Sequence, residues 1–165
     1  MLPFIFMHMN QLPKFVATFF GLGFIPIAPG TFGALGGFIV SYLLLVLGFD
    51  FKLFHSIHFI LVLISYMAGV WACKRLSSEW GPDPSRVVID ETIGFWISIL
   101  FLPVDLWVFL IGFVLFRFFD IIKPLGIRKI DQWHTPNSVM LDDVLAGIYT
   151  NVVLQVIVYF YYPVI

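Results

Sequence analysis

Five of the ten acidic residues in this chain stand at the ends of apolar runs. Two adjacent pairs each open an apolar run, and a single aspartate closes another. A carboxylate beside an apolar environment is costly to desolvate, so it usually has a cation, a basic partner or a function. Because carboxylate oxygens are the ligands that hard cations prefer, we expect these residues to bind Mg²⁺. The five acidic residues are Asp90, Glu91, Asp120, Asp142 and Asp143.

A basic residue lies on each side of Asp120. Arg117, Asp120 and Lys123 are spaced three residues apart, which places them on one face of a helix. A charged stripe on so apolar a helix must face a polar cavity or the membrane interface. Since Arg and Lys side chains pair with phosphate oxygens, we predict that Arg117 and Lys123 hold a phosphate beside the metal. The structural alternative is a salt-bridged helix end with cations that reach to the interface.

A glycine follows each acidic pair. Gly94 comes four residues after Asp90, and Gly147 comes four residues after Asp143. Such a glycine leaves room for close helix packing or for a ligand. Neighbouring carboxylates on a helix point about 100° apart, so we expect one member of a pair to bind metal and the other to orient water or a second ion. The helix dipole alone would explain one such pair better than two.

Two other places supply candidate site residues. Pro29 and Gly30 interrupt the chain before a long apolar run, and Thr31 is a suitable N-cap. The N–H groups at such a helix start bind phosphate, so Gly30 and Thr31 are candidate phosphate ligands, with an ordinary loop and cap as the alternative. His134 lies in a polar segment before Asp142 and is a candidate acid, base or metal ligand.

The composition places these residues in a membrane protein. The 165 residues are 61% hydrophobic and 12% charged, with a mean hydropathy of +1.00, whereas a soluble domain has about 25% charged residues. The length suits one domain over residues 1–165. The net charge of −1 gives no support for nucleic-acid binding, and no protein partner follows from the sequence.

Apolar runs predict an all-α, polytopic fold with about five transmembrane helices. Three runs are each long enough to cross a hydrocarbon core of roughly 30 Å. Two shorter runs flank Pro103 and indicate a helical hairpin, and a short run near the N-terminus predicts an interfacial or re-entrant helix. The five predicted spans cover residues 31–49, 53–73, 92–102, 106–116 and 144–162, and the N-terminal helix covers residues 15–27.

Basic residues predict the orientation of these spans. With the N-terminus in the cytoplasm, only Lys52 among the nine Lys and Arg residues faces the outside. The same assignment puts all five acidic residues on the cytoplasmic side. We therefore predict a single site at that membrane face.

Four sequence blocks resemble, in order, the hallmark blocks of the phosphatidylglycerophosphatase A family. They are PIAPGT at residues 26–31, DETIG at 90–94, FRFFDIIKP at 116–124 and DDVLAG at 142–147. The resemblance implies a largely helical, Mg²⁺-dependent lipid phosphatase of the bacterial cytoplasmic (inner) membrane. Such enzymes convert phosphatidylglycerophosphate to phosphatidylglycerol. The chain departs from the family where Gly126 replaces a second proline, and where Thr135 and Pro136 replace two glycines.

Residues and resemblance together predict phosphomonoester hydrolysis at the cytoplasmic face. Direct attack by water and an aspartyl-phosphate route through Asp120 or Asp142 both stay open. The alternative function is a small cation transporter or channel lined by the acidic residues, although they cluster at one membrane face rather than along a span. The candidate catalytic residues, which would transfer protons or attack phosphorus, are Asp90, Asp120, Asp143 and His134.

Overall fold

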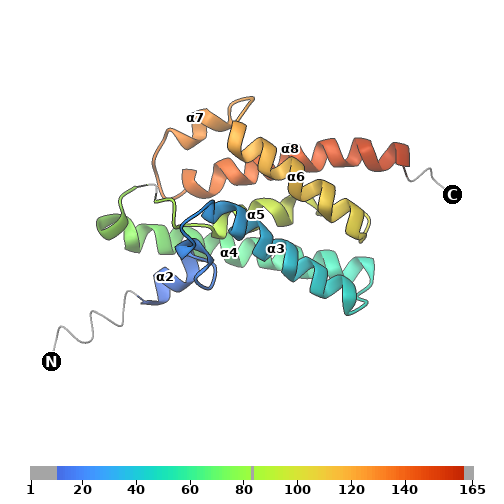
Figure 1. Cartoon of the computed structure of the whole chain (residues 1–165), viewed down its shortest axis with the longest axis horizontal. Helices are drawn as coiled ribbons and strands as arrows, with labels where there is room; N and C mark the ends of the chain where they lie inside the picture. Colours follow the sequence, from blue (N-terminus) through green and yellow to red (C-terminus); the bar gives the residue numbers. More distant parts are fainter. Residues whose placement is uncertain (1–10, 83, 162–165) are drawn as a thin grey trace.

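The computed structural model describes residues 11–82 and 84–161, and these residues are helical with no strand among them (Figure 1). This confirms the predicted all-α class. The last predicted span ends at Tyr162, which lies outside the described residues. The elements are α2 (Gln11–Ala17), the short 3₁₀ helix η1 (Leu22–Phe24), α3 (Pro29–Val46), α4 (Phe51–Trp80), α5 (Ile89–Ser98), α6 (Leu106–Ile122), α7 (Ile127–Asp131) and α8 (Ser138–Tyr161).

Three of these helices, α3, α4 and α8, are long and apolar enough to cross a membrane. The prediction was about five. The two arms of the expected hairpin are shorter: α5 has 10 residues and α6 has 17, which correspond to lengths of about 15 Å and 25 Å. Length and composition therefore support membrane association through fewer long helices than the apolar runs predicted.

The N-terminal segment 15–27 is not the single short helix that was expected. Helix α2 ends at Ala17, and the backbone then turns through left-handed conformations before η1. Thr18 fixes this turn, because its hydroxyl donates to Lys14 O (2.7 Å) and accepts from Gly21 N (3.0 Å). A side chain that bonds local backbone competes in this way with helix continuation.

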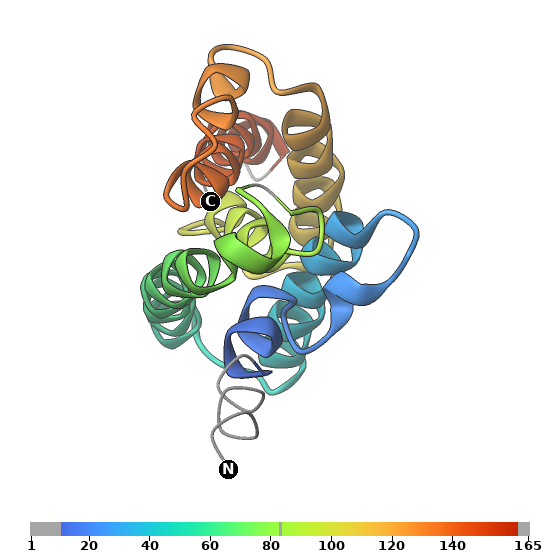
Figure 2. The ribbon, with the colours of Figure 1, turned by 90° about the vertical axis from the view of Figure 1, so that its left-hand side faces the viewer.

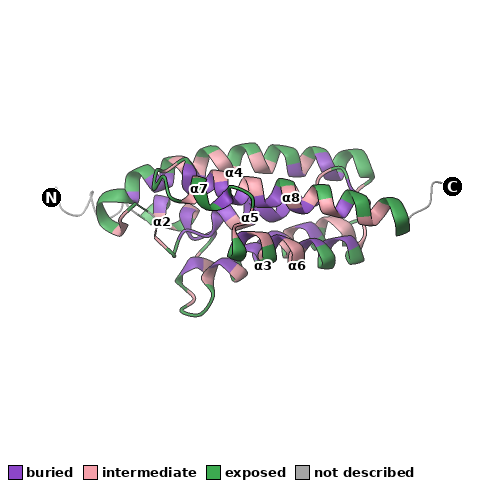
Figure 3. Ribbon diagram, turned by 90° about the horizontal axis from the view of Figure 1, so that it is seen from above, coloured by how far each residue is buried: buried purple, intermediate pink, exposed green. Residues whose placement is uncertain are grey.

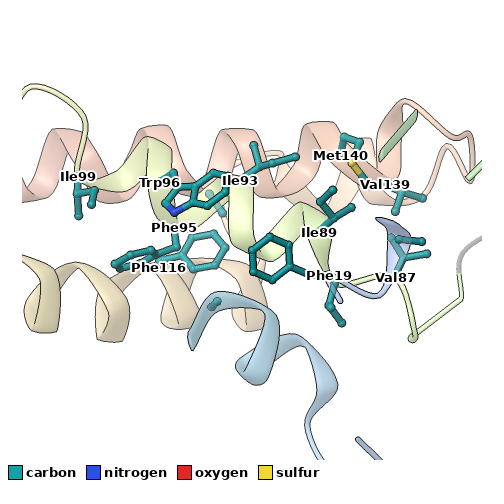
Figure 4. Packing of buried hydrophobic residues seen from close by; sticks show 14 of the residues in the cluster. Phe19, Val87, Ile89, Ile93, Phe95, Trp96, Ile99, Phe116, Val139 and Met140 are labelled. Carbon is teal, nitrogen blue, oxygen red and sulfur yellow. The ribbon is translucent and has the colours of Figure 1, made fainter. Parts of the chain in front are cut away.

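Helix α5 lies at the centre of the bundle. Eight of its ten residues are buried, which is typical of a helix enclosed by its neighbours (Figure 3). Its aromatic and aliphatic side chains pack against α3, α6 and α8, as around Ile93, Phe95 and Trp96 (Figure 4). Trp96 Nε1 also donates to Gly37 O in α3 (3.0 Å). Neighbouring helices therefore hold α5 on every side.

The helices alternate in direction, so the beginnings of some helices lie beside the ends of others at one end of the bundle. Helices α3, α5 and α8 begin there, and α4 and α6 end there (Figure 1, left). Figure 2 looks onto this end, with α7 and the segment before α5 in front. The five predicted acidic residues lie in the first turn of α5, the second turn of α8 and the last turn of α6. The fold therefore gathers them at one end.

Candidate functional site

A cavity of about 260 Å³ opens at this end of the bundle. It lies between the start of α3, the segment before α5, the first turns of α5 and α8, and the last turn of α6 with the loop that follows. Its lining is rich in charge. The charged lining residues are Asp90, Glu91, Arg117, Asp120, Lys123, Asp131, Asp142 and Asp143.

Two glycines allow α5 and α8 to touch beside this cavity. A methyl group on Gly147 would lie 2.4 Å from Gly94 O, and one on Gly94 would lie 2.7 Å from Asp143 O. Real Cβ atoms do not approach so closely, so both positions require glycine. Because each glycine stands one helical turn beyond an acidic pair, this contact brings the two pairs together. The sequence reading of Gly94 as a close-packing residue is confirmed.

Asp90, Glu91 and Asp143 form the tightest group in the cavity. Each offers a carboxylate oxygen, and these oxygens lie within 4.8 Å of one another. Neighbouring acids were expected to diverge, yet both Asp90 and Glu91 face Asp143, because they occupy the first turn of a helix that α8 crosses closely. The Asp120 carboxyl lies beside that of Asp143. The group is thus a set of buried oxygen ligands of the kind that hard cations prefer.

Arg117 stands between these acids with hydrogen-bonding capacity to spare. Its Nη1 lies 2.5 Å from Asp120 Oδ2 and 3.9 Å from Glu91 Oε1. The close pair is an ion pair by distance, but its N–H direction does not complete a hydrogen bond. Nε and Nη1 of Arg117 are therefore buried without a hydrogen-bond partner. Buried donors without acceptors are costly, and a phosphate oxygen would satisfy them.

Lys123 enters the cavity from just beyond the end of α6. It follows Ile122 in a left-handed conformation (φ 49°), and Pro124 follows it, as expected for a helix stopped by proline. Its Nζ pairs with Asp142 and, at 2.5 Å, with Asp131. Burial lowers the pKa of Lys123, but the hydrogen bonds with Asp131 and Asp142 outweigh burial and raise this pKa overall. Lys123 is therefore a permanent cation.

Carboxyl groups outnumber basic side chains in the cavity. Six carboxyl groups line it against two cations, an excess of four negative charges if all are ionised. Burial, and then the nearby Asp143 carboxylate, raises the pKa of Glu91 to about 8. Burial, and then Glu91, raises the pKa of Asp90 well above its ordinary value. Glu91 Oε2 and Asp142 Oδ1 are also buried without a hydrogen-bond partner. The donor set and its charge thus fit one or two divalent cations.

Of the three other predicted site residues, one lines the cavity and two do not. Gly30 lines it, and a methyl group there would lie 1.9 Å from Glu91 Oε1. Thr31 is not an N-cap, because α3 begins at Pro29 after Ala28, and the Thr31 N–H already donates to Ala28 O (2.9 Å). His134 is exposed, with a left-handed backbone (φ 50°), and is not among the lining residues.

Asp131 is a lining residue that the sequence reading missed. It ends the short helix α7, eight residues after Lys123, where no apolar periodicity frames it. The loop reaches it through Gly126, whose φ of 94° a proline cannot adopt. This explains why the departure from the family's second proline matters here, since glycine sets the path of the loop that brings Asp131 to Lys123.

Fold and site together define a class: a membrane-associated, all-helical enzyme with a carboxylate-rich site suited to a phosphate ester. Comparison with known proteins agrees with this class. The sequence profile named phosphatidylglycerophosphatase A matches residues 15–158. The chain belongs to the phosphatidylglycerophosphatase A family, and it is a phosphatase.

Three relatives cover most of the chain. A Bacteroides thetaiotaomicron protein, provisionally named a phosphatidylinositol-3-phosphatase, is 45% identical over 88% of this chain and 92% of its own length. A Haemophilus influenzae phosphatidylglycerophosphatase A is 37% identical over 87% of each chain. An Escherichia coli phosphatidylglycerophosphatase A is 34% identical over 86% of this chain and 81% of its own. No solved structure shows significant similarity to the chain.

Proposed function

We propose that this protein removes the terminal phosphate of phosphatidylglycerophosphate, with Mg²⁺, at the cytoplasmic face of the bacterial inner membrane. One observation carries the proposal. Within residues 11–82 and 84–161, the buried side-chain N and O atoms that lack a hydrogen-bond partner belong to Glu91, Arg117 and Asp142. Unpartnered acceptors and donors in one cavity call for two ligands of opposite charge, a cation and a phosphate. The family and two of the named relatives support the lipid substrate.

Asp90, Glu91 and Asp143, with Asp120 beside them, would hold the cation. When bound, a divalent cation supplies positive charge against the phosphate oxygens and lowers the pKa of a bound water. Its charge would also neutralise carboxylates that burial otherwise makes unfavourable to ionise. The excess of negative charge in the cavity is consistent with either one or two ions.

Arg117 would donate to the non-bridging oxygens of the phosphate through Nε and Nη1. Lys123, held between Asp131 and Asp142, would add a second positive charge on the other side of the cavity. In hydrolysis by water, the new bond joins water oxygen to phosphorus, the bond from phosphorus to the glycerol oxygen breaks, and a proton must reach that oxygen. Asp120, which lies between Arg117 and Asp143, would accept the proton of the attacking water.

A covalent route remains the mechanistic alternative, with Asp120 or Asp142 attacking phosphorus and water then hydrolysing the aspartyl phosphate. The two routes differ in stereochemistry. Direct attack inverts a chiral thiophosphoryl substrate, and a double displacement retains its configuration. Rapid quenching would also trap a base-labile phosphoenzyme on the covalent route only.

Phosphatidylinositol 3-phosphate is a second candidate substrate, because the 45% identical relative carries that name. The same cavity chemistry would serve either lipid, since both present a phosphomonoester on a headgroup. The assay is phosphate release by the protein purified in detergent, from each lipid in turn, with Mg²⁺ and then with excess EDTA. We expect Mg²⁺-dependent release that is faster from phosphatidylglycerophosphate. Release from neither lipid by folded protein would overturn the proposal and leave the cation transporter as the rival.

A further inference from the structure

Helix α5 ends in the interior of the bundle, where a helix end is costly. Its last residue is Ser98, and residues 99–105 continue without regular helix until α6 begins at Leu106. The last four carbonyls of a helix have no partner within the helix. In an apolar environment, water is not there to satisfy them. Phe95 O accepts from the Ser98 hydroxyl (2.6 Å), and Trp96 O and Ile97 O accept from the N–H groups that follow the helix. Ser98 O needs a partner from another helix.

Asn151 of α8 supplies the partner of Ser98 O and adds bonds to Ile97 O and Leu100 O. Its Nδ2 lies 3.2 Å from Ile97 O, 3.1 Å from Ser98 O and 2.9 Å from Leu100 O. Its own Oδ1 accepts from Gln155 Nε2 (2.7 Å). A side-chain amide carries two N–H donors, so the three carbonyls share them. One residue of α8 thus closes the end of α5.

His55 of α4 secures the next part of the segment. Its Nδ1 accepts from Phe101 N–H (3.1 Å), so the ring hydrogen resides on Nε2, which donates to Leu102 O (2.9 Å). His55 is 3% exposed. Phe101 has a left-handed backbone (φ 61°), a conformation that a bulky residue keeps only when its surroundings impose it. His55 is one of those surroundings.

These bonds act on the same short helix that carries Asp90 and Glu91 in its first turn. We propose that Asn151 and His55 are positioning residues of the active site: they anchor the inner end of α5 and so fix the depth at which Asp90 and Glu91 face Asp143. A helix of ten residues transmits an axial shift from one end to the other with little loss. Site geometry tolerates only about 0.5 Å. This inference rests on the proposed function, in which Asp90, Glu91 and Asp143 bind the cation.

The test compares Asn151→Leu with Gln155→Leu in the full-length protein. Both replace an amide on α8 by an apolar side chain, but only Asn151 has hydrogen bonds to the end of α5, whereas Gln155 bonds Asn151. A second pair, His55→Phe and His58→Phe, decides the question if Asn151→Leu does not fold. His58 bonds Ser41 and Phe54 O rather than the 99–102 segment. The readouts are kcat, KM for the lipid, and the Mg²⁺ concentration that gives half of the Mg²⁺-induced rise in Tm.

We expect Asn151→Leu to lower kcat about 10–100-fold, with KM nearly unchanged, and to raise the half-maximal Mg²⁺ concentration about 10-fold or more. Gln155→Leu and His58→Phe should leave both quantities near wild type. An Asn151→Leu protein with a lower Tm but normal kcat and Mg²⁺ response would overturn the proposal, and so would a wild-type Tm that does not respond to Mg²⁺. If wild type hydrolyses neither lipid, yet Asn151→Leu alone weakens the Mg²⁺-induced rise in Tm, the proposed function fails and the positioning role stands.

Discussion

The two ends of α5 both contain buried residues and differ in how their polar groups are paired. At the outer end, carboxylates outnumber cations, and buried oxygens and nitrogens of Glu91, Asp142 and Arg117 have no hydrogen-bond partner. At the inner end, Asn151 and His55 satisfy the carbonyls and an amide of the 97–102 segment. Burial alone therefore does not mark a site in this protein. Unpaired polar atoms mark it, because a folded protein tolerates their cost only when a ligand pairs them.

The largest effect is expected when one charge is removed from the outer end. Asp143→Asn keeps the size of the side chain but removes a carboxylate from the group of three. We expect kcat to fall by roughly 100-fold or more, since even outer-shell partners of a metal cost 10–100-fold. Phosphate release per folded protein measures the effect. The matched control is Asp105→Asn, an N-cap that accepts from Trp107 N at the start of α6 and that asparagine can replace. Near-normal turnover by Asp143→Asn would remove Asp143 from the site.

A smaller effect is expected when one methyl group is added to the outer end. The methyl group of Gly30→Ala would lie 1.9 Å from Glu91 Oε1, so the carboxylate must move. We expect kcat to fall about 10–100-fold, because displacement by about 1 Å is enough for that loss. Measuring kcat together with the Mg²⁺-induced rise in Tm separates a displaced ligand from a destabilised fold.

The control for that variant is Gly36→Ala, two turns further along α3. Its methyl group would meet the ends of the Leu22 and Phe19 side chains instead of a carboxylate. Its Tm can change, but its response to Mg²⁺ should not. Equal losses of Mg²⁺ response in both variants would show that α3 packing, and not the position of Glu91, controls the site.

Sequence could predict the outer end of α5 because local patterns encode it. The acidic pairs, the glycines four residues after Asp90 and Asp143, and the spacing of Arg117 and Lys123 are all short-range features. Asp131 escaped prediction because its pairing with Lys123 depends on left-handed turns at Lys123 and Gly126. His134 was a candidate because it lies near Asp142 in the sequence, but its own left-handed turn places it in the exposed part of the loop.

The inner end could not be predicted, because its partners are distant in the sequence. The apolar run continues through Leu102, so hydrophobicity predicts that the helix continues with it. The helix instead ends at Ser98, and Asn151 and His55, 53 and 46 residues from their partners Ser98 and Phe101, bond the backbone there. Single-sequence periodicity carries no record of such contacts. About five spans were predicted and three long apolar helices are found, because α5 and α6, the two arms of the expected hairpin, have only 10 and 17 residues.

The smallest expected effect concerns pH and stability in the absence of a cation. The pKa of Glu91 is raised from 4.5 to about 8, chiefly by burial and then by Asp143. Between these values the unfolded chain releases its proton while the folded protein keeps it, so the free energy of unfolding falls as pH rises from about 5 to 8. In EDTA, Tm should therefore decline across this range, by about 2–4 °C for each kcal/mol lost in a chain of this size.

Magnesium should flatten that decline, because a bound cation stabilises the ionised carboxylates. Glu91→Gln should reduce it without any cation, and Asp90, whose pKa burial also raises, should keep part of it. Gln155→Leu should keep the full decline, since the inner end of α5 has no acidic group. A Tm that is constant from pH 5 to 8 in EDTA would mean that the outer end is already neutralised within the protein. The contrast between the two ends of α5 would then lie in geometry alone, and the excess of carboxylates would no longer argue for a cation.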